Sequence, residues 1–212
     1  RPFILKKPNP LNHFIGVKDH IAGNFSTEQI ALHNFSDGYC GLSKIEGDRY
    51  CLCYLTTAEN LKRCGNSIAT METEILSQNP YLKKIIGERK SFYEQPITIS
   101  QVSFNRKSQV ENHVLMLGDA AGLITPLCGN GMSMAMHSGK LAVELIDHFL
   151  QKKISRERME QLYQKRWKKL FARRLAAGRM IQRLFGKPST TDVFLKLMNK
   201  TPKLTQWLIR QT

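Results

Sequence analysis

The stretch His113–Met136, HVLMLGDAAGLITPLCGNGMSMAM, decides how the chain is interpreted. A short apolar run, Val114–Leu117, leads into Asp119; a turn segment with Pro126 follows, and Gly129–Gly131 opens a long helical pattern. This order predicts a strand that ends at one carboxylate, then a loop, then a helix whose N-terminus carries no bulky side chain.

Such an arrangement suits a nucleotide cofactor. In open α/β sheets, ligands bind at the carboxyl ends of the strands. A helix N-terminus offers unpaired N–H groups and a partial positive charge to an anionic group. The carboxylate is then available for a sugar hydroxyl, and the glycine-lined helix end for an electron-rich ring or a phosphate.

The same residues carry a family resemblance. The string GDAAG at 118–122, followed by Pro126, GNGM at 129–132, AM at 135–136 and SG at 138–139, resembles the GD motif and following helix of FAD-dependent oxidoreductases. These are flavoproteins of the geranylgeranyl reductase and aromatic hydroxylase type. The reductase branch resembles the chain more closely, because the hydroxylases usually have His where Gly122 stands.

The resemblance implies a role for several residues. Asp119 would contact the ribose of FAD, Pro126 would lie beside the isoalloxazine, and the N–H groups around Gly131 and Met132 would face the pyrimidine edge. The predicted cofactor-binding residues are therefore Gly118, Asp119, Ala120, Pro126, Gly129, Asn130, Gly131 and Met132. No catalytic residue and no metal ligand is assigned. The alternative is an ordinary strand–loop–helix whose glycines only permit tight turns.

The glycine-rich string G-x-G-x-x-G that opens these flavoproteins is absent. Gly129-Asn130-Gly131 comes nearest to it, but Met134 stands where the third glycine should be. We therefore expect the chain to be the C-terminal half of a longer protein, with the N-terminal half as its partner. Alone, it would hold FAD weakly or not at all.

The predicted function is that of an FAD-dependent oxidoreductase, reductase-like, acting on a hydrophobic, lipid-like or aromatic small molecule. Monooxygenase and halogenase chemistry remain open, and NAD(P)H is a candidate electron donor. In such enzymes the flavin supplies the redox chemistry, and the protein supplies orientation, electrostatics and exclusion of water.

Composition fits a globular protein, with 42% apolar and 23% charged residues among 212. No apolar run reaches the ~18 residues of a transmembrane helix, and no signal peptide is visible, which together predict a cytoplasmic protein. The five cysteines are expected to be reduced. Cys51 and Cys53 should share one face of a strand and are expected to be buried; neither they nor the histidines have metal-ligand spacing.

Charge is concentrated in the tail. Residues 1–150 carry a net charge of +1, whereas residues 151–212 hold 17 Lys and Arg against 3 Asp and Glu. The alternative function is therefore a non-catalytic basic module that binds an anionic membrane surface or nucleic acid. Nucleic acid is disfavoured because the tail lacks the known binding signatures. A helix docked on its own protein, with its basic face in water, is the preferred interpretation of the tail, ahead of contact with a membrane surface.

The predicted fold is mixed α/β (α+β), in three parts. Residues 1–108 form an antiparallel substrate-domain sheet with helices, 109–150 the GD strand and helix of a Rossmann-like FAD domain, and 151–212 a tail of basic helices. The expected elements are a β-meander over 13–55, helices over 57–77 and 81–86, an edge strand over 92–104, a strand at 114–117 buried on both faces, helices over 131–150, 155–185 and 192–199, and an apolar turn at 207–209.

Overall fold

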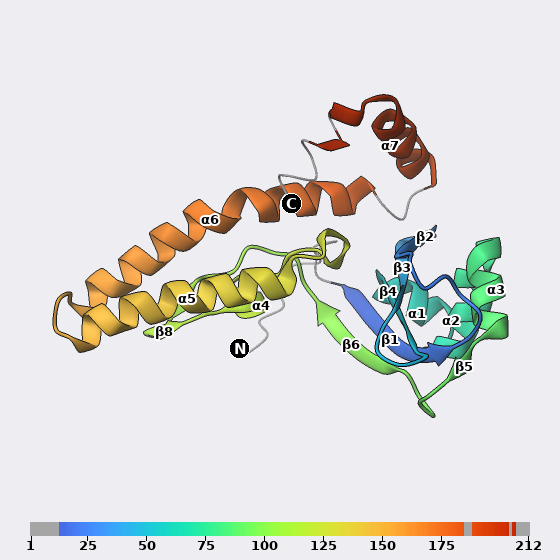
Figure 1. The fold of residues 1–212 in the computed structure, drawn as a ribbon, viewed down its shortest axis with the longest axis horizontal. Helices are drawn as coiled ribbons and strands as arrows, with labels where there is room; N and C mark the ends of the chain where they lie inside the picture. The colour runs from blue at the N-terminus through green and yellow to red at the C-terminus, as the bar shows by residue number, and fades with distance from the viewer. Residues whose placement is uncertain (1–12, 185–187, 204, 207–212) are drawn as a thin grey trace. The chain divides into compact units, whose positions relative to one another are not determined.

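The computed structural model describes residues 13–184, 188–203 and 205–206 (Figure 1). Their contacts divide into two units. Unit 1 holds residues 13–103, 184 and 188–195, and unit 2 holds residues 104–183, 196–203 and 205–206. The mixed α/β class is confirmed, and the three-part division at 108 and 150 stays a prediction.

Unit 1 is built on a six-stranded antiparallel sheet in the order β2-β3-β4-β1-β5, with β6 also paired to β1. The strands are β1 (Phe14–Ala22), β2 (Ala31–Phe35), β3 (Gly38–Lys44), β4 (Tyr50–Thr57), β5 (Lys90–Ser91) and β6 (Ile97–Val102). The predicted antiparallel sheet is confirmed, but a meander starting at β1 is wrong. β1 pairs with β4, placing Val17 opposite Tyr54, while β2, with Leu32 exposed, forms the edge. β1 lies between β4 and the short strands β5 and β6, and six of its nine residues are buried, as expected for a central strand.

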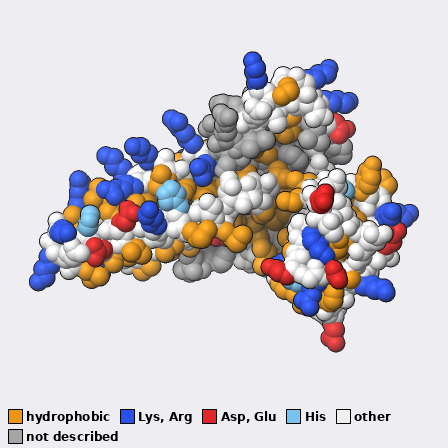
Figure 2. All heavy atoms as spheres, in the orientation of Figure 1, with side chains coloured by type: hydrophobic (Ala, Val, Ile, Leu, Met, Phe, Trp, Pro, Cys, Tyr) orange, Lys and Arg blue, Asp and Glu red, His pale blue; other side chains and the backbone are white. Residues whose placement is uncertain are grey.

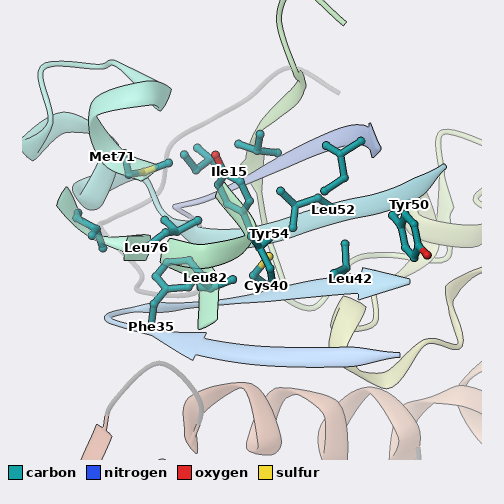
Figure 3. Close-up of a cluster of buried hydrophobic side chains, with 14 of the residues drawn as sticks. Ile15, Phe35, Cys40, Leu42, Tyr50, Leu52, Tyr54, Met71, Leu76 and Leu82 are labelled. Atoms are coloured by element: carbon teal, nitrogen blue, oxygen red, sulfur yellow. The ribbon is translucent and has the colours of Figure 1, made fainter. Parts of the chain in front are cut away.

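Period-two alternation sets the core of unit 1. Inward-facing residues of the strands pack against α2, η1 and α3, as Figure 3 shows for part of the cluster. Its members include Ile15, Val17, Ile21, Cys40, Leu42, Leu52, Tyr54, Met71, Leu76 and Leu82. Side chains two apart on a strand share one face, so the sheet presents one apolar face to the helices.

The first predicted helix of unit 1, over 57–77, is divided into shorter elements. They are α1 (Ala58–Arg63), α2 (Ile68–Glu74), η1 (Leu76–Gln78) and α3 (Pro80–Glu88). One helix running to residue 77 is wrong, because Gly65 and Asn66 both adopt positive φ and end α1. α3 is confirmed: the Asn79 side chain accepts hydrogen bonds from the N–H groups of Tyr81 and Leu82 and caps it. Pro96 immediately precedes β6, which pairs only with β1 among the described strands.

Unit 2 starts with a small hairpin of β7 (Val110–Glu111) and β8 (Val114–Leu115). Its two turn residues, Asn112 and His113, both have positive φ, as a type I′ turn requires. The prediction of a strand buried on both faces is wrong: Val114 is 56% exposed and Leu117 is 43% exposed. The reason is pairing, since β7 is the one strand that flanks β8 in the described part of the chain.

The rest of unit 2 is helical: α4 (Gly118–Ala121), η2 (Pro126–Cys128), α5 (Gly131–Leu150) and α6 (Arg156–Leu184); α7 (Pro188–Lys200) follows. α5 and α6 share an apolar core of Met134, Leu141, Leu145, Met159, Tyr163, Trp167, Phe171 and Leu175. Leu170, on the same helix, is exposed. α7 begins four residues earlier than predicted, at Pro188, a residue type that suits the first turn of a helix. The predicted apolar turn at 207–209 lies outside the described residues.

The basic tail is a docked helix with its cations in solvent. The apolar stripe of α6 is buried against α5, and Figure 2 shows Lys and Arg side chains gathered along α6. The stripe that a helix lying on a bilayer would insert is therefore occupied within the protein itself. Within the described residues, no helix is long and apolar enough to cross a membrane.

The cysteines are free thiols. Cys51 and Cys53 do share one face of β4, but it is the face away from the core, so the expectation that both are buried is wrong: Cys51 is half-buried and Cys53 exposed. Cys40 and Cys64 are buried. Burial is the leading cause that raises the pKa of the Cys40 thiol far above its ordinary value.

Candidate functional site

The structure gathers the predicted cofactor residues at the two ends of one loop in unit 2. Gly118, Asp119 and Ala120 form most of α4, Pro126 begins η2, Gly129 and Asn130 join η2 to α5, and Gly131 and Met132 are the first residues of α5. All eight are exposed or half-buried, so their backbone is accessible from solvent.

The two ends are tied together through α5. Gly118 has a φ of +51° and donates its N–H to the Oγ of buried Ser138 at 3.2 Å. A Cβ on Gly118 would lie 3.2 Å from the Cβ of Ala135. The small residues at 118, 135 and 138 therefore let the GD turn lie directly on the first turns of α5.

Asp119 lies in α4, past the end of β8 at Leu115, and not at the strand tip.

The N-terminus of α5 is open. Gly129 adopts φ +67°, a conformation that favours glycine, and turns the chain into the helix. The N-cap residue, Asn130, makes no side-chain cap hydrogen bond. A Cβ added at Gly131 would meet only the Ile124 side chain, at 4.0 Å. The first-turn N–H groups of this 20-residue helix have no partner within the helix, so an electron-rich group placed against them would be stabilised.

The middle of the loop is packed against α6. A Cβ on Gly122 would lie 2.8 Å from the Trp167 ring and 3.1 Å from Leu175, so no larger residue fits there without rearrangement. Tyr163 donates its hydroxyl to the carbonyl of Met116 at 2.6 Å, and burial raises the pKa of Tyr163 to about 12. α6 therefore fixes the strand and loop that carry the candidate site.

Two polar residues outside the motif also hold the loop. Lys107 donates its Nζ to the carbonyl oxygen of Asp119 at 2.8 Å. Buried Gln109 donates its Nε2 to the carbonyls of Lys107 and Ala121, at 2.7 and 3.2 Å. None of these hydrogen bonds involves the Asp119 carboxylate. Sequence reasoning missed both, because isolated Lys and Gln residues before a strand carry no spacing signal.

Unit 1 contains a buried polar network that the sequence analysis also missed. Glu72 accepts hydrogen bonds from Tyr54 at 3.0 Å and from both terminal nitrogens of Arg89. Burial disfavours the charged form of Arg89, but the hydrogen bonds to Glu72 together with electrostatic interactions with Glu72, Asp19 and Tyr54 raise the pKa of Arg89. Nearby, the Asp19 carboxylate accepts from Ser91 at 2.8 Å. One signal was available: Asp19 occupies an inward position of β1, between Val17 and Ile21.

The network lines a cavity of about 480 Å³ in unit 1, together with Tyr93 and Thr98. Arg89 is paired with Glu72 at the wall of this cavity, so we assign this pair a structural role. In the described residues, no group of His, Cys, Asp or Glu is arranged to hold a metal ion.

Solved structures of other proteins share this fold. The chain superposes on a flavin-dependent brominase, Bmp2, with a TM-score of 0.72 at 18% identity, over 94% of this chain and 50% of that one. It also superposes on a geranylgeranyl bacteriochlorophyll reductase-like protein from Thermoplasma acidophilum, with a TM-score of 0.66 at 16% identity, over 86% and 45%. The chain has the fold of these flavoproteins. The resemblance predicted from the GD string is confirmed.

The sequence relatives include reductases. A digeranylgeranylglycerophospholipid reductase of Methanococcoides burtonii is 28% identical over 139 residues, which is 61% of this chain and 34% of the relative. No family model matches the chain. The alignments to curated relatives cover between 16% and 40% of their lengths, so the chain corresponds to less than half of each.

Proposed function

We propose that this chain is the C-terminal half of an FAD-dependent oxidoreductase, reductase-like, and that residues 118–132 form its part of the flavin site. The observation that carries the proposal is the open N-terminus of α5, bracketed by Asp119 on one side and tied to the GD turn through Ser138. The fold neighbours are flavin-dependent enzymes, which supports the choice of cofactor.

The residues present fit one part of the flavin. The open backbone at Gly129 and Gly131 leaves room for a planar ring, and the exposed Asp119 carboxylate suits a ribose hydroxyl. Pro126 would lie beside the isoalloxazine, and the N–H groups of Gly131 and Met132 would meet its pyrimidine edge. No string in the chain suits the pyrophosphate. When bound, the flavin supplies hydride transfer to or from the substrate.

The chain's own contribution to the chemistry is electrostatic. A helix N-terminus carries about half a positive elementary charge, which stabilises an anion placed against it. The reduced flavin is anionic at its pyrimidine edge, so the first turn of α5 would favour the reduced state. The N–H of Gly118, held by Ser138, keeps the GD turn fixed on that helix and so keeps the two halves of the site in register.

A second face of α5 supports an unseen partner half. Its apolar side chains Met132, Met136, Val143, Ile146 and Leu150 recur at helical spacing and are all exposed, opposite the face buried against α6. A helix that is apolar on both faces is normally buried on both. We infer that the N-terminal half of the flavoprotein covers this face and the free edge of β8.

The relatives support a substrate class for this proposal. The reductase named above acts, by its name, on a lipid with isoprenoid chains, which supports a hydrophobic or lipid-like substrate for this protein. An aromatic small molecule is the second choice, with monooxygenase or halogenase chemistry. NAD(P)H as the electron donor and a cytoplasmic location remain part of the proposal.

The basic-module alternative is less well supported, because the apolar stripe of α6 is used inside unit 2. Contact with an anionic membrane would have to rest on the cationic face alone. A salt titration of liposome binding tests this: purely electrostatic binding falls steeply as salt rises.

The decisive experiment is an absorbance spectrum of the longest gene product that contains these residues, before and after FAD addition. We expect bound-flavin absorbance there and little or none for residues 1–212 alone.

Gly131→Leu should remove the bound flavin while the circular dichroism spectrum is unchanged, because Gly131 has open space around it. Gly87→Leu, at an exposed α3 glycine with nothing within 4 Å, is the matched control. Normal flavin content in Gly131→Leu would refute the assignment.

A further inference from the structure

Unit 2 contains a cavity that the flavin proposal does not use. It has a volume of about 440 Å³ and lies between residues 105–109, residues 121–123 of the loop and one side of α6. None of the eight predicted flavin residues lines it. It therefore belongs to the α6 side of the loop, whereas the flavin residues gather around the N-terminus of α5.

All the charged side chains that line this cavity are positive. Arg106, Lys107, Lys168 and Arg179 line it, and no Asp or Glu is among its fifteen lining residues. No described carboxylate forms an ion pair with Arg106, Lys168 or Arg179. Three cations from two separate segments thus converge without a negative partner in the described chain.

Two of these cations, Arg106 and Arg179, repel each other. Burial, followed by the positive charges of Arg106 and Arg183, lowers the pKa of Arg179. Holding like charges together costs free energy that an anion between them would recover. A guanidinium with a purely structural role would instead meet a carboxylate, as Arg89 meets Glu72 in unit 1.

The remaining walls are apolar. Leu123, Trp167 and Leu175 line the cavity, and the last two are buried. The volume lies within the ~300–1,000 Å³ typical of small-molecule sites. An occupant should therefore have an anionic group for the cations and a less polar body for this wall.

We propose that this cavity binds a phosphate-bearing small molecule, with the phosphate or pyrophosphate group held by Arg106, Lys168 and Arg179. Guanidinium groups bind phosphate oxygens in a bidentate geometry, which makes phosphate the preferred anion at a site with two arginines. The proposal does not depend on flavin binding, and it can be tested on the chain as it stands.

The test is calorimetric titration of residues 1–212 with inorganic pyrophosphate at physiological salt. We expect saturable binding near one equivalent, weakened at least tenfold by Arg106→Ala and by Arg179→Ala. Arg179→Lys keeps the positive charge but lacks the paired N–H donors of the guanidinium group. Its affinity for pyrophosphate should lie between those of the wild type and Arg179→Ala. The matched control is Arg173→Ala: Arg173 is an exposed α6 residue outside the cavity, so the net charge changes equally. We expect less than a twofold effect there.

Two results would overturn the proposal. One is the absence of saturable pyrophosphate binding by a folded wild-type chain. The other is equal weakening in Arg173→Ala and Arg179→Ala, which would mean general attraction to a basic surface. Circular dichroism and thermal unfolding of each variant separate lost binding from lost folding.

A further arm distinguishes the source of the phosphate. Cosedimentation with phosphatidylglycerol vesicles is measured for the wild type, Arg179→Ala and Arg173→Ala, with and without pyrophosphate. If the ligand is a lipid headgroup, Arg179→Ala alone reduces vesicle binding and pyrophosphate competes with it. If the ligand is a soluble phosphate compound, the two variants bind vesicles equally while only Arg179→Ala loses pyrophosphate. Both patterns support the site and assign its ligand.

Discussion

Replacing Gly122 by Ala should destabilise unit 2 through a single methyl group. The backbone of Gly122 is extended, so the substitution introduces no conformational strain of its own. The added Cβ would lie 2.8 Å from Cη2 of Trp167 and 3.1 Å from Leu175. Both side chains are buried, with 3% and 6% of their surface exposed, so neither has free space into which to move.

Overpacking of this kind costs about 1–3 kcal/mol. For a protein of this size each kcal/mol corresponds to roughly 2–4 °C in Tm. We therefore expect a decrease of at least a few degrees, measured by urea unfolding and by thermal unfolding followed through tryptophan fluorescence. Gly139→Ala is the matched control, because nothing lies within 4 Å of a Cβ at that position in the interior of α5. It should be stabilised by about 0.5–1 kcal/mol, since alanine restricts the unfolded chain.

A double-mutant cycle identifies the contact responsible. Trp167→Phe removes the second ring of the side chain, and with it the atom that the new methyl group would meet. The cost of Gly122→Ala should then be smaller in the Trp167→Phe background, with a coupling of about 0.5–3 kcal/mol. Equal stability of Gly122→Ala and the wild type, or the same cost in both backgrounds, would refute the packing argument.

Three further predictions concern buried polar groups. Glu72→Ala leaves the partly buried Arg89 without its carboxylate and should cost about 3–5 kcal/mol of unfolding free energy in urea; a loss below 1 kcal/mol would contradict this. Tyr163→Phe should cost about 1 kcal/mol at neutral pH by removing one hydrogen bond. The folded pKa of Tyr163 is about 12, against ~10 for an unfolded tyrosine. The stabilisation that comes from this pKa difference is therefore complete below pH 10 and is lost as the pH rises to 12. Tyr163→Phe should lose less stability than the wild type between pH 10 and 12, and an equal loss in both proteins would count against the raised pKa. Iodoacetamide with mass spectrometry should label exposed Cys53 before buried Cys40, and the reverse order would contradict the burial of β3.

The sequence supported most of the fold because its periodic signals were strong. Apolar residues at helical spacing located α5 and α6, and alternation located the strands of unit 1. The order of the strands was not predictable in the same way. β1 and β2 are neighbours along the chain, and only competition for the central position of the sheet, which depends on all the strands together, moves β1 to β4.

The candidate site was predictable where local backbone geometry imposes a residue type. Gly129 needs a positive φ and Gly131 opens a helix, so their chemistry can be inferred from a single sequence. Lys107 and Gln109 hold the same loop through hydrogen bonds to carbonyl groups twelve residues away. Any side chain with an N–H of suitable reach could make these bonds, and so they leave no recognisable pattern.

The strand at 114–117 shows where a correct pattern can give a wrong local structure. A continuously apolar run is typical of a strand with neighbours on both sides and layers on both faces. Within the part of the chain that the structure describes, β8 pairs with β7 alone, and Val114 and Leu117 are exposed. The exposed stripe of α5 has the same character. Both features have a composition suited to a larger sheet-and-helix layer, and a half-flavoprotein accounts for them together. Restoring that layer should bury both at once: hydrogen exchange at the β8 amides and oxidation of Met132 and Met136 by peroxide should slow in parallel. If β8 became protected while both methionines remained reactive, separate partners would be required.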